Sequence, residues 1–285
     1  MNTKSKIATI AVALGMAASS SISHADEDAD LVVNGEIEMV VRTAAPAHLE
    51  GAVSTIYSGW VFRSDETQAM QADDFDNPGM LFVEKGEQLF NTAMGADGQS
   101  CASCHQSSDL TNVRATYPQW DAEHSEVQTV EMQVRECQTE QMGMEEPWGI
   151  NSGDMLDITA FIASIGRGQI VDVAIDGPAH ETWELGREIY YTRFGQLELS
   201  CANCHEENYG NRIRADHLSQ GQINGFPTYR LKNARLNGVQ NRFRGCVRDT
   251  RAETYGIGSD EFVALELYVA SRGNGLTVEG PSVRN

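Results

Sequence analysis

The sequence predicts a mainly α protein in which two tandem copies of one small helical fold follow an N-terminal extension. The pattern Cys-x-x-Cys-His occurs twice, as CASCH at 101–105 and as CANCH at 201–205. Each pattern follows an amphipathic stretch that begins just after a proline, and each precedes a second helical pattern. Two thiols at this spacing with an adjacent imidazole are typical of c-type haem attachment. We therefore expect two tandem class I cytochrome c-like domains.

The chemistry of haem attachment explains the spacing of both motifs. Two thiols three positions apart reach the two vinyl groups of one porphyrin, and the next imidazole reaches the iron. A structural zinc site, the alternative, would need the four thiols as one set or additional histidines, whereas each pair has its own adjacent histidine. The sequence thus predicts two covalent haems. Their expected anchors are Cys101, Cys104, Cys201 and Cys204, with His105 and His205 as proximal iron ligands.

Residues 1–25 have the pattern of a signal peptide. Lys4 and Lys6 precede an apolar stretch at 7–18, and small residues lead to Ala25. We expect cleavage near Ala25 and a periplasmic mature protein; a retained amphipathic anchor is the alternative. No later apolar run approaches the length of about 20 residues that a membrane-spanning helix needs, so no membrane insertion is predicted.

Residues 26–78 form the predicted N-terminal extension, which contains no haem motif. Alternating hydrophobicity at 37–41 and the aromatic residues Tyr57, Trp60 and Phe62 indicate that this segment packs on a domain or on a partner.

An internal repeat divides the remaining chain into a first domain at 79–175 and a second at 176–285. Gly86, Phe90, Gly95 and Ser100 have counterparts 100 positions later in Gly186, Tyr190, Gly195 and Ser200. The closing helix of the first copy is expected from about Asp154, with Met155, Ile158 and Ile162 on its buried face. In the second copy Ser259 is the expected N-cap, and Phe262, Leu265 and Val269 form the buried face.

One spare cysteine per copy, Cys137 and Cys246, is a candidate for the second axial ligand of each haem. The second copy contains no methionine, the common axial ligand of electron-transfer cytochromes c. Thiolate is the form of cysteine that binds metal, and we place Cys246 on an arginine-rich loop. A disulfide between the two cysteines is the alternative. Other candidate ligands are His217 in the second copy and Met132, Met142, Met144 and His124 in the first.

Charge separates the two copies. The formal net charge is −20, which argues against binding to nucleic acid or anionic lipid. Residues 121–146, around Cys137, contain eight acids and one base, whereas residues 230–251, around Cys246, contain seven bases and one acid. Such a cluster of bases would focus a small anion on the second haem, although a single arginine is as readily explained by pairing with a haem propionate.

These residues resemble a known family. The tandem haem motifs, the spare cysteines and the run RFRGC at 242–246 are similar to the A subunit of the SoxAX cytochromes, the L-cysteine S-thiosulfotransferases of bacterial sulfur oxidation. The resemblance covers essentially the whole mature chain. Because both motifs are present, the chain is similar to the dihaem form of that subunit.

The resemblance implies a set of roles. Cys246 would be the distal ligand of the second haem and the catalytic residue, which the family carries as a cysteine persulfide. Arg242 would bind the substrate, and Cys137 would be the distal ligand of the first haem. The implied reaction joins thiosulfate to a cysteine of a SoxYZ-type carrier protein and passes two electrons to haem, with the monohaem SoxX subunit as permanent partner.

Two other functions remain open on the sequence. The chain could be a plain dihaem electron-transfer cytochrome, in which both cysteines only tune the haem potential. It could also be a thiosulfate dehydrogenase that forms tetrathionate.

Overall fold

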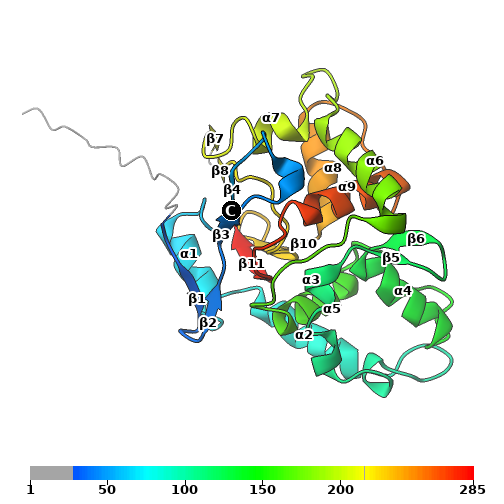
Figure 1. Ribbon diagram of the computed structural model, residues 1–285. Helices are drawn as coiled ribbons and strands as arrows, with labels where there is room; N and C mark the ends of the chain where they lie inside the picture. Colours follow the sequence, from blue (N-terminus) through cyan, green and yellow to red (C-terminus); the bar gives the residue numbers. More distant parts are fainter. Residues whose placement is uncertain (1–27, 215) are drawn as a thin grey trace, which may run out of the picture.

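The computed structural model describes residues 28–214 and 216–285 (Figure 1). The predicted signal peptide at 1–25 lies outside these residues. Among the described residues, no helix has both the length and the apolar character that a membrane crossing requires. The fold is mainly α, as predicted, and its strands are short and lie in small antiparallel pairs, with one parallel addition.

The N-terminal segment, residues 28–78, is a layer of short elements that covers the C-terminal part of the chain. Strands β1 (Leu31–Val33) and β2 (Ile37–Met39) form one antiparallel pair, and β3 (Arg42–Ala44) and β4 (Thr55–Tyr57) form another. The 3-10 helix η1 (Ala47–Leu49) and helix α1 (Asp65–Ala72) complete the segment. Its own small core contains Trp60, Val61 and Phe62, so the aromatic residues noted in the sequence are structural.

Hydrogen bonds fix this segment to residues more than 150 positions away. The Tyr57 amide donates to Gln220 Oε1 at 2.9 Å, and Gln71 Nε2 donates to Glu279 Oε2 at 3.1 Å. Helix α1 also contacts strand β11 (Ser282–Arg284). The segment therefore packs on the C-terminal part of the chain.

The first helical unit lies between α2 (Met80–Asn91) and α5 (Gly153–Ile165), which cross each other. Between them the chain forms η2 (Cys101–Ser103), η3 (Ser107–Leu110), α3 (Val113–Thr116), the hairpin of β5 (Gln119–Asp121) and β6 (Glu126–Gln128), and α4 (Val130–Glu140). Helix α5 begins one residue before the expected Asp154, and its predicted buried face is buried.

The second helical unit repeats this order. Its first helix α6 (His180–Tyr191), preceded by η4 (Gly177–Ala179), crosses α9 (Asp260–Ser271). Ser259 caps α9, as predicted, by accepting a hydrogen bond from the Phe262 amide at 3.4 Å. The intervening elements are α7 (Cys201–His205), β7 (Arg212–Ile213), β8 (Asp216–His217), the hairpin of β9 (Thr228–Arg230) and β10 (Arg235–Asn237), and α8 (Val239–Asp249).

A glycine makes each helix crossing close. A Cβ added to Gly86 would lie 2.1 Å from Asp157 O, and one added to Gly186 would lie 1.9 Å from Ala264 O. Only a residue without a side chain allows the two backbones to approach this closely. The aromatic partners in the repeat meet at the same crossings, where the ring centroids of Tyr190 and Tyr268 are 5.1 Å apart.

The two units exchange their hairpins. Strand β6 of the first unit packs on α9 of the second, and β10 of the second packs on α5 of the first. Accordingly, Val127 belongs to the core around Trp183 and Phe262, whereas Leu236 belongs to the core around Phe90 and Phe161. Strand β11 then adds to β9 in parallel register. Figure 1 shows this strand at the centre of the molecule, between the N-terminal segment and the helical units.

Candidate functional site

The second haem motif lies on the short helix α7, which begins in a capping box. Ser200 Oγ accepts from the Asn203 amide at 3.3 Å, and Asn203 Oδ1 accepts from the Ser200 amide at 2.9 Å. This reciprocal arrangement satisfies two backbone donors that the helix itself leaves unpaired. Cys201 and Cys204 therefore project from one fixed turn, as attachment of both thiols to one porphyrin requires.

His205 is oriented for metal binding by the loop that follows α7. Its Nδ1 lies 2.7 Å from Ser219 O, and because a carbonyl only accepts, Nδ1 carries the proton and Nε2 keeps its lone pair. Gly221, with φ +80°, packs so close that an added Cβ would lie 3.0 Å from His205 Cγ. Burial, followed by the charges of Arg242 and Arg272, lowers the pKa of His205 to about 4, so the imidazole stays neutral.

Cys246 lies on helix α8 and not on a loop, which corrects the sequence-based expectation. The arginine-rich run is helical because its buried residues Val239 and Val247 lie on the face toward the core. Burial raises the pKa of Cys201 to about 12, and the nearby Cys246 contributes to that rise and to the raised pKa of Cys204. The fold thus brings the spare thiol near the haem motif from helix α8, which begins 34 positions after the end of α7.

Arginines from three parts of the chain surround this site. Arg242 is exposed on α8, one turn before Cys246. Burial and the charges of Arg284, Arg242 and Arg230 lower the pKa of Arg63 to about 10, although Asp216 opposes the shift. Arg63 comes from the N-terminal segment and is held there because Nη2 donates to His217 O at 2.7 Å. No local pattern of residues indicates Arg63, because only tertiary packing brings it here.

His217, the other candidate ligand in the second copy, packs toward the N-terminal segment. Its Nδ1 lies 3.3 Å from Phe62 O, and it belongs to the short strand β8. His217 therefore contacts the N-terminal segment through Phe62, and its carbonyl accepts the hydrogen bond from Arg63 at the site.

The first haem motif is more open than the second. Cys101 is half-buried, whereas Cys104 and His105 are exposed on and after η2. Cys137 lies on α4, at the position that Cys246 has on α8. Burial raises the pKa of Cys101 to about 11, and the charge of Cys137 is the second cause of that rise. Gln133 Nε2 lies 3.9 Å from Cys137 Sγ.

The competing ligands of the first copy have other surroundings. Met142 is buried, with its carbonyl against Gly95, and Met132 packs on the core of the second unit. The His124 ring lies between two carboxylates, those of Asp121 and Glu136. No two of the six cysteines are joined in a disulfide, so Cys137 and Cys246 are not paired with each other.

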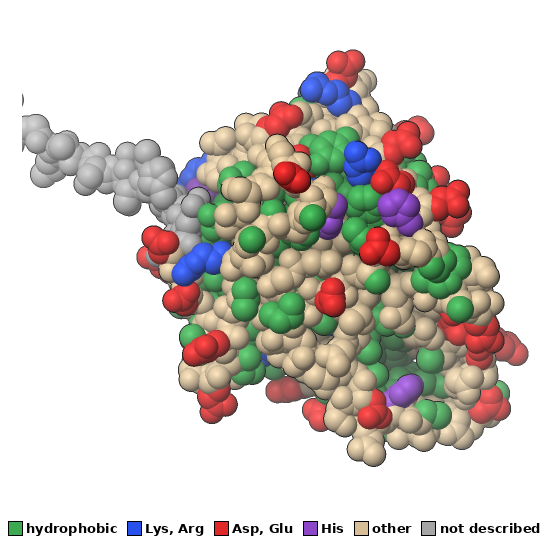
Figure 2. All heavy atoms as spheres, in the orientation of Figure 1, with side chains coloured by type: hydrophobic (Ala, Val, Ile, Leu, Met, Phe, Trp, Pro, Cys, Tyr) green, Lys and Arg blue, Asp and Glu red, His purple; other side chains and the backbone are tan. Residues whose placement is uncertain are grey.

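These residues fit a covalent haem at each motif. Each offers two thiols and one imidazole, with a further sulfur from a helix, and that donor set is suited to iron porphyrin. Figure 2 shows a hollow in the surface near α4 and α5, with hydrophobic side chains on its wall and a histidine at its edge. Acidic side chains gather beside it, over α4 and the β5–β6 hairpin, and few basic side chains lie on this face.

The whole chain is similar to known proteins. The sequence profile described as "SoxA/TsdA, cytochrome c domain" matches residues 85–171. The L-cysteine S-thiosulfotransferase subunit SoxA of Rhodovulum sulfidophilum is 55% identical over 98% of both chains, and that of Paracoccus pantotrophus is 54% identical over 99% of both. A chain in the crystal structure of SoxXA from P. pantotrophus superposes with a TM-score of 0.88 at 56% identity, covering 90% of this chain and 99% of that one.

Proposed function

This chain belongs to the SoxA family of L-cysteine S-thiosulfotransferase subunits, and from that premise we propose that its second haem motif, with Cys246 and Arg242, is the site of the transferase reaction. It is a haem-binding cytochrome subunit of thiosulfate oxidation. The observation that carries the site assignment is the convergence of Cys246 and an arginine cluster on the motif at 201–205.

Two haems are held in two tandem domains. The first domain spans 79–175 and the second 176–285, and the residues at 26–78 form an extension that adds Arg63 to the second site. Support comes from the two helix crossings with their paired glycines and from the exchanged hairpins. Cys101, Cys104, His105 and Cys137 would hold the first haem; Cys201, Cys204, His205 and Cys246 would hold the second.

Cys246 acts as the sulfur that receives and passes on thiosulfate. The sulfane sulfur of thiosulfate and the Cys246 sulfur form one S–S bond, and two electrons leave the pair. A cysteine thiolate of the carrier then attacks the sulfane sulfur, the bond to Cys246 breaks, and Cys246 is released as an anion. The net change is one S–S bond on the carrier and two electrons removed. When Cys246 carries a persulfide sulfur, that terminal sulfur takes the same part.

The chain's own residues bind the anion and keep the imidazole of His205 neutral. Arg242 is exposed and reaches the sulfonate oxygens by charge-assisted hydrogen bonds. The proton on His205 Nδ1, held by Ser219, keeps Nε2 available. The haem, when bound, would supply a one-electron acceptor, so the two electrons would leave one at a time through it to the partner subunit.

The partners follow from the family. A monohaem SoxX subunit forms the heterodimer and takes the electrons onward, and a SoxYZ-type carrier brings its cysteine on a flexible arm. The solved relative is a SoxXA structure, which supports the first of these. The protein works in the periplasm after cleavage near Ala25, and the mass of the purified mature chain tests that position.

Replacement of Cys246 by Met tests the site. We expect Cys246→Met to retain both haems, because Met also ligates haem iron, and to lose transfer of thiosulfate to the carrier. The matched control is Cys137→Met, the same change in the first copy, which should retain turnover. Haem content by absorbance, transfer by mass of the carrier, and intact mass for extra sulfur are measured together.

The outcomes separate the candidate functions. Retained transfer in Cys246→Met would remove the assignment of this sulfur and leave a dihaem electron carrier. Tetrathionate formed from thiosulfate without carrier, at a rate comparable with transfer, would make the chain a thiosulfate dehydrogenase instead.

A further inference from the structure

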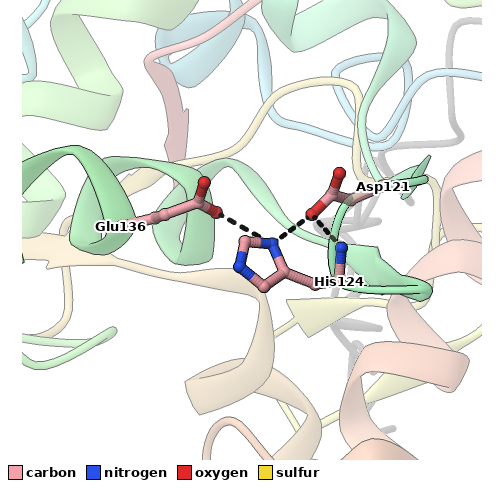
Figure 3. A group of neighbouring side chains, drawn as sticks. All are labelled: Asp121, His124 and Glu136. Carbon is pink, nitrogen blue, oxygen red and sulfur yellow. Dashed lines mark hydrogen bonds and ion pairs between the residues drawn. The ribbon is translucent and has the colours of Figure 1, made fainter. Parts of the chain in front are cut away.

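A cluster outside both haem motifs brings a histidine and two carboxylates together. Asp121 ends strand β5, His124 lies in the hairpin turn, and Glu136 lies on α4. One potential ligand atom from each residue lies within 4.8 Å of the other two. Figure 3 shows the His124 ring between the two carboxylates, with its Nδ1 facing both.

Local structure holds these side chains in place. The turn amides of Glu123 and His124 donate to Asp121 at 3.0 and 3.2 Å, so the carboxylate is fixed by its own hairpin. His124 Nδ1 lies 2.5 Å from Asp121 Oδ2 and 3.7 Å from Glu136 Oε2. The carboxylates of Asp121 and Glu136 are each only 22% exposed. Two such anions this close repel each other unless a cation, either a protonated His124 or a bound metal ion, lies between them.

The second copy of the fold has no such cluster. Its hairpin has the same register, since Arg230 pairs with Arg235 as Asp121 pairs with Glu126. At the places of Asp121, His124 and Glu136, counted from the strand end and from the spare cysteine, the second copy has Arg230, Asn233 and Gly245. The cluster is therefore not part of the shared haem scaffold. The second copy has the positive charge of Arg230 at the place of Asp121, where the first copy has one of three side chains that face one another.

Gln128 gives an independent indication that an ion belongs here. The residue is 4% exposed, and its Nε2 donates to Asp121 Oδ2 at 3.2 Å and to Glu136 Oε2 at 2.8 Å. Its Oε1 is buried and has no hydrogen-bond partner among the described residues. A half-turn of the amide exchanges Oε1 and Nε2 with almost no change in shape. That turn is unfavourable beside two bare carboxylates but favourable beside a cation, which would make the oxygen a further ligand.

We propose that Asp121, His124 and Glu136 form a binding site for a divalent transition-metal ion of the Zn²⁺ class, with Gln128 Oε1 or water completing the coordination. One imidazole with two carboxylates is a zinc-type donor set, whereas Ca²⁺ requires six to eight oxygens and Mg²⁺ an octahedron of oxygens. Bonds to Zn²⁺ of about 2 Å place ligand atoms roughly 3 to 4 Å apart. The present spacing thus needs only small side-chain movements.

Such an ion would fasten the β5–β6 hairpin to α4, one residue before Cys137. Because β6 also packs on α9 of the second unit, the ion would stiffen the contact between the two units. The site is structural in this proposal and takes no part in the transfer reaction.

Metal binding to the tag-free, haem-loaded chain tests the proposal. After treatment with a chelator, the protein is titrated with Zn²⁺, Mg²⁺ and Ca²⁺ by calorimetry, and bound metal is counted by mass spectrometry beside the haem iron. We expect one Zn²⁺ per chain, weaker or no binding of Mg²⁺ and Ca²⁺, and a higher melting temperature with Zn²⁺.

Three variants make the test specific. Glu136→Gln and His124→Gln should weaken Zn²⁺ binding at least tenfold and abolish the rise in melting temperature. Glu126→Gln, an exposed acid on the same hairpin, removes the same charge as Glu136→Gln and should bind like the parent chain. Glu136→Gln leaves the hairpin turn intact, and His124→Gln serves if that variant fails to fold.

Three results would overturn the proposal. These are the absence of a saturable zinc site, zinc binding that both ligand variants retain, and binding of Ca²⁺ at least as tight as that of Zn²⁺. In the first two cases His124 as a protonated counter-ion would be the whole explanation of the cluster, and in the third the site would be one for an oxygen-preferring cation.

Discussion

Arg242 and Gln133 occupy the same place relative to the two spare cysteines, each one helical turn before the sulfur. In the first copy the side chain is neutral and its Nε2 lies 3.9 Å from Cys137 Sγ. In the second it is cationic, and other arginines lie nearby. A neutral amide cannot offset the charge of an anionic substrate, so this single difference explains why we assign anion chemistry to the second copy alone.

The first copy itself suggests the variant that tests Arg242. We predict that Arg242→Gln lowers kcat/KM for thiosulfate roughly 10- to 150-fold, because one charge-assisted hydrogen bond contributes about 1.5 to 3 kcal/mol. Steady-state transfer to the carrier measures this effect. Arg248→Gln, an exposed arginine on the same helix, should change it little. Similar losses in both variants would show that the helix contributes only general charge.

Individual residues of the site were predictable where the chemistry is local. The haem motif predicts the roles of Cys201, Cys204 and His205, because covalent attachment fixes their spacing. The residues that orient them are not predictable in this way. Ser219 and Gly221 act on His205 through the shape of a loop, and Arg63 arrives from the N-terminal segment.

Helices α4, α8 and α9 meet around a buried carboxylate, Glu266. The side chain is 1% exposed and accepts from Gln240 Nε2 on α8 at 3.0 Å. Burial, followed by the charge of Glu131 on α4, raises the pKa of Glu266 to about 8, while Arg114 and the bond from Gln240 oppose the shift. A carboxyl that links the two units is therefore protonated over much of the neutral range.

This carboxyl predicts how stability depends on pH. Its pKa in the folded state is above that of the unfolded chain, so its contribution to the free energy of unfolding is complete below about pH 4.5 and is lost as the pH rises through about 8. We expect Glu266→Gln to melt with a weaker decline between pH 5 and 8 than the parent chain. Scanning calorimetry at several pH values measures this, with the exposed Glu253→Gln as control. Parallel curves for Glu266→Gln and the parent chain would contradict the prediction.

The longer elements were predictable and the shorter ones were not. Helices α5 and α9 follow from apolar periodicity and capping serines. Helix α8 is the exception among the longer elements, because its many charged residues hide a narrow buried face and its sequence predicts a loop. Strands of two or three residues, such as β11, exist because a partner strand is present, and no local pattern of hydrophobicity specifies them.

The distribution of charge over the molecule is uneven, with a net charge of −20 and a local excess of bases around Cys246. Under the proposed function the local cluster would attract thiosulfate, while the distant acids would act only over distances that salt readily screens. We predict that kcat/KM for thiosulfate falls as ionic strength rises from about 0.01 to 0.1 M, because the screening length shrinks from about 30 to about 10 Å. Arg242→Gln should reduce this dependence. A rate that rises with salt would show that the net charge dominates instead.

The contact between Gln71 and the last strand spans 212 positions along the chain, since the Val283 amide donates to Gln71 Oε1 at 3.2 Å. During synthesis, the early segment is made long before the residues that it must meet. It therefore has to wait without its proper neighbours, and closure of the molecule comes late and slowly. The first-made segment and the last-made strand thus meet only when nearly the whole chain is available.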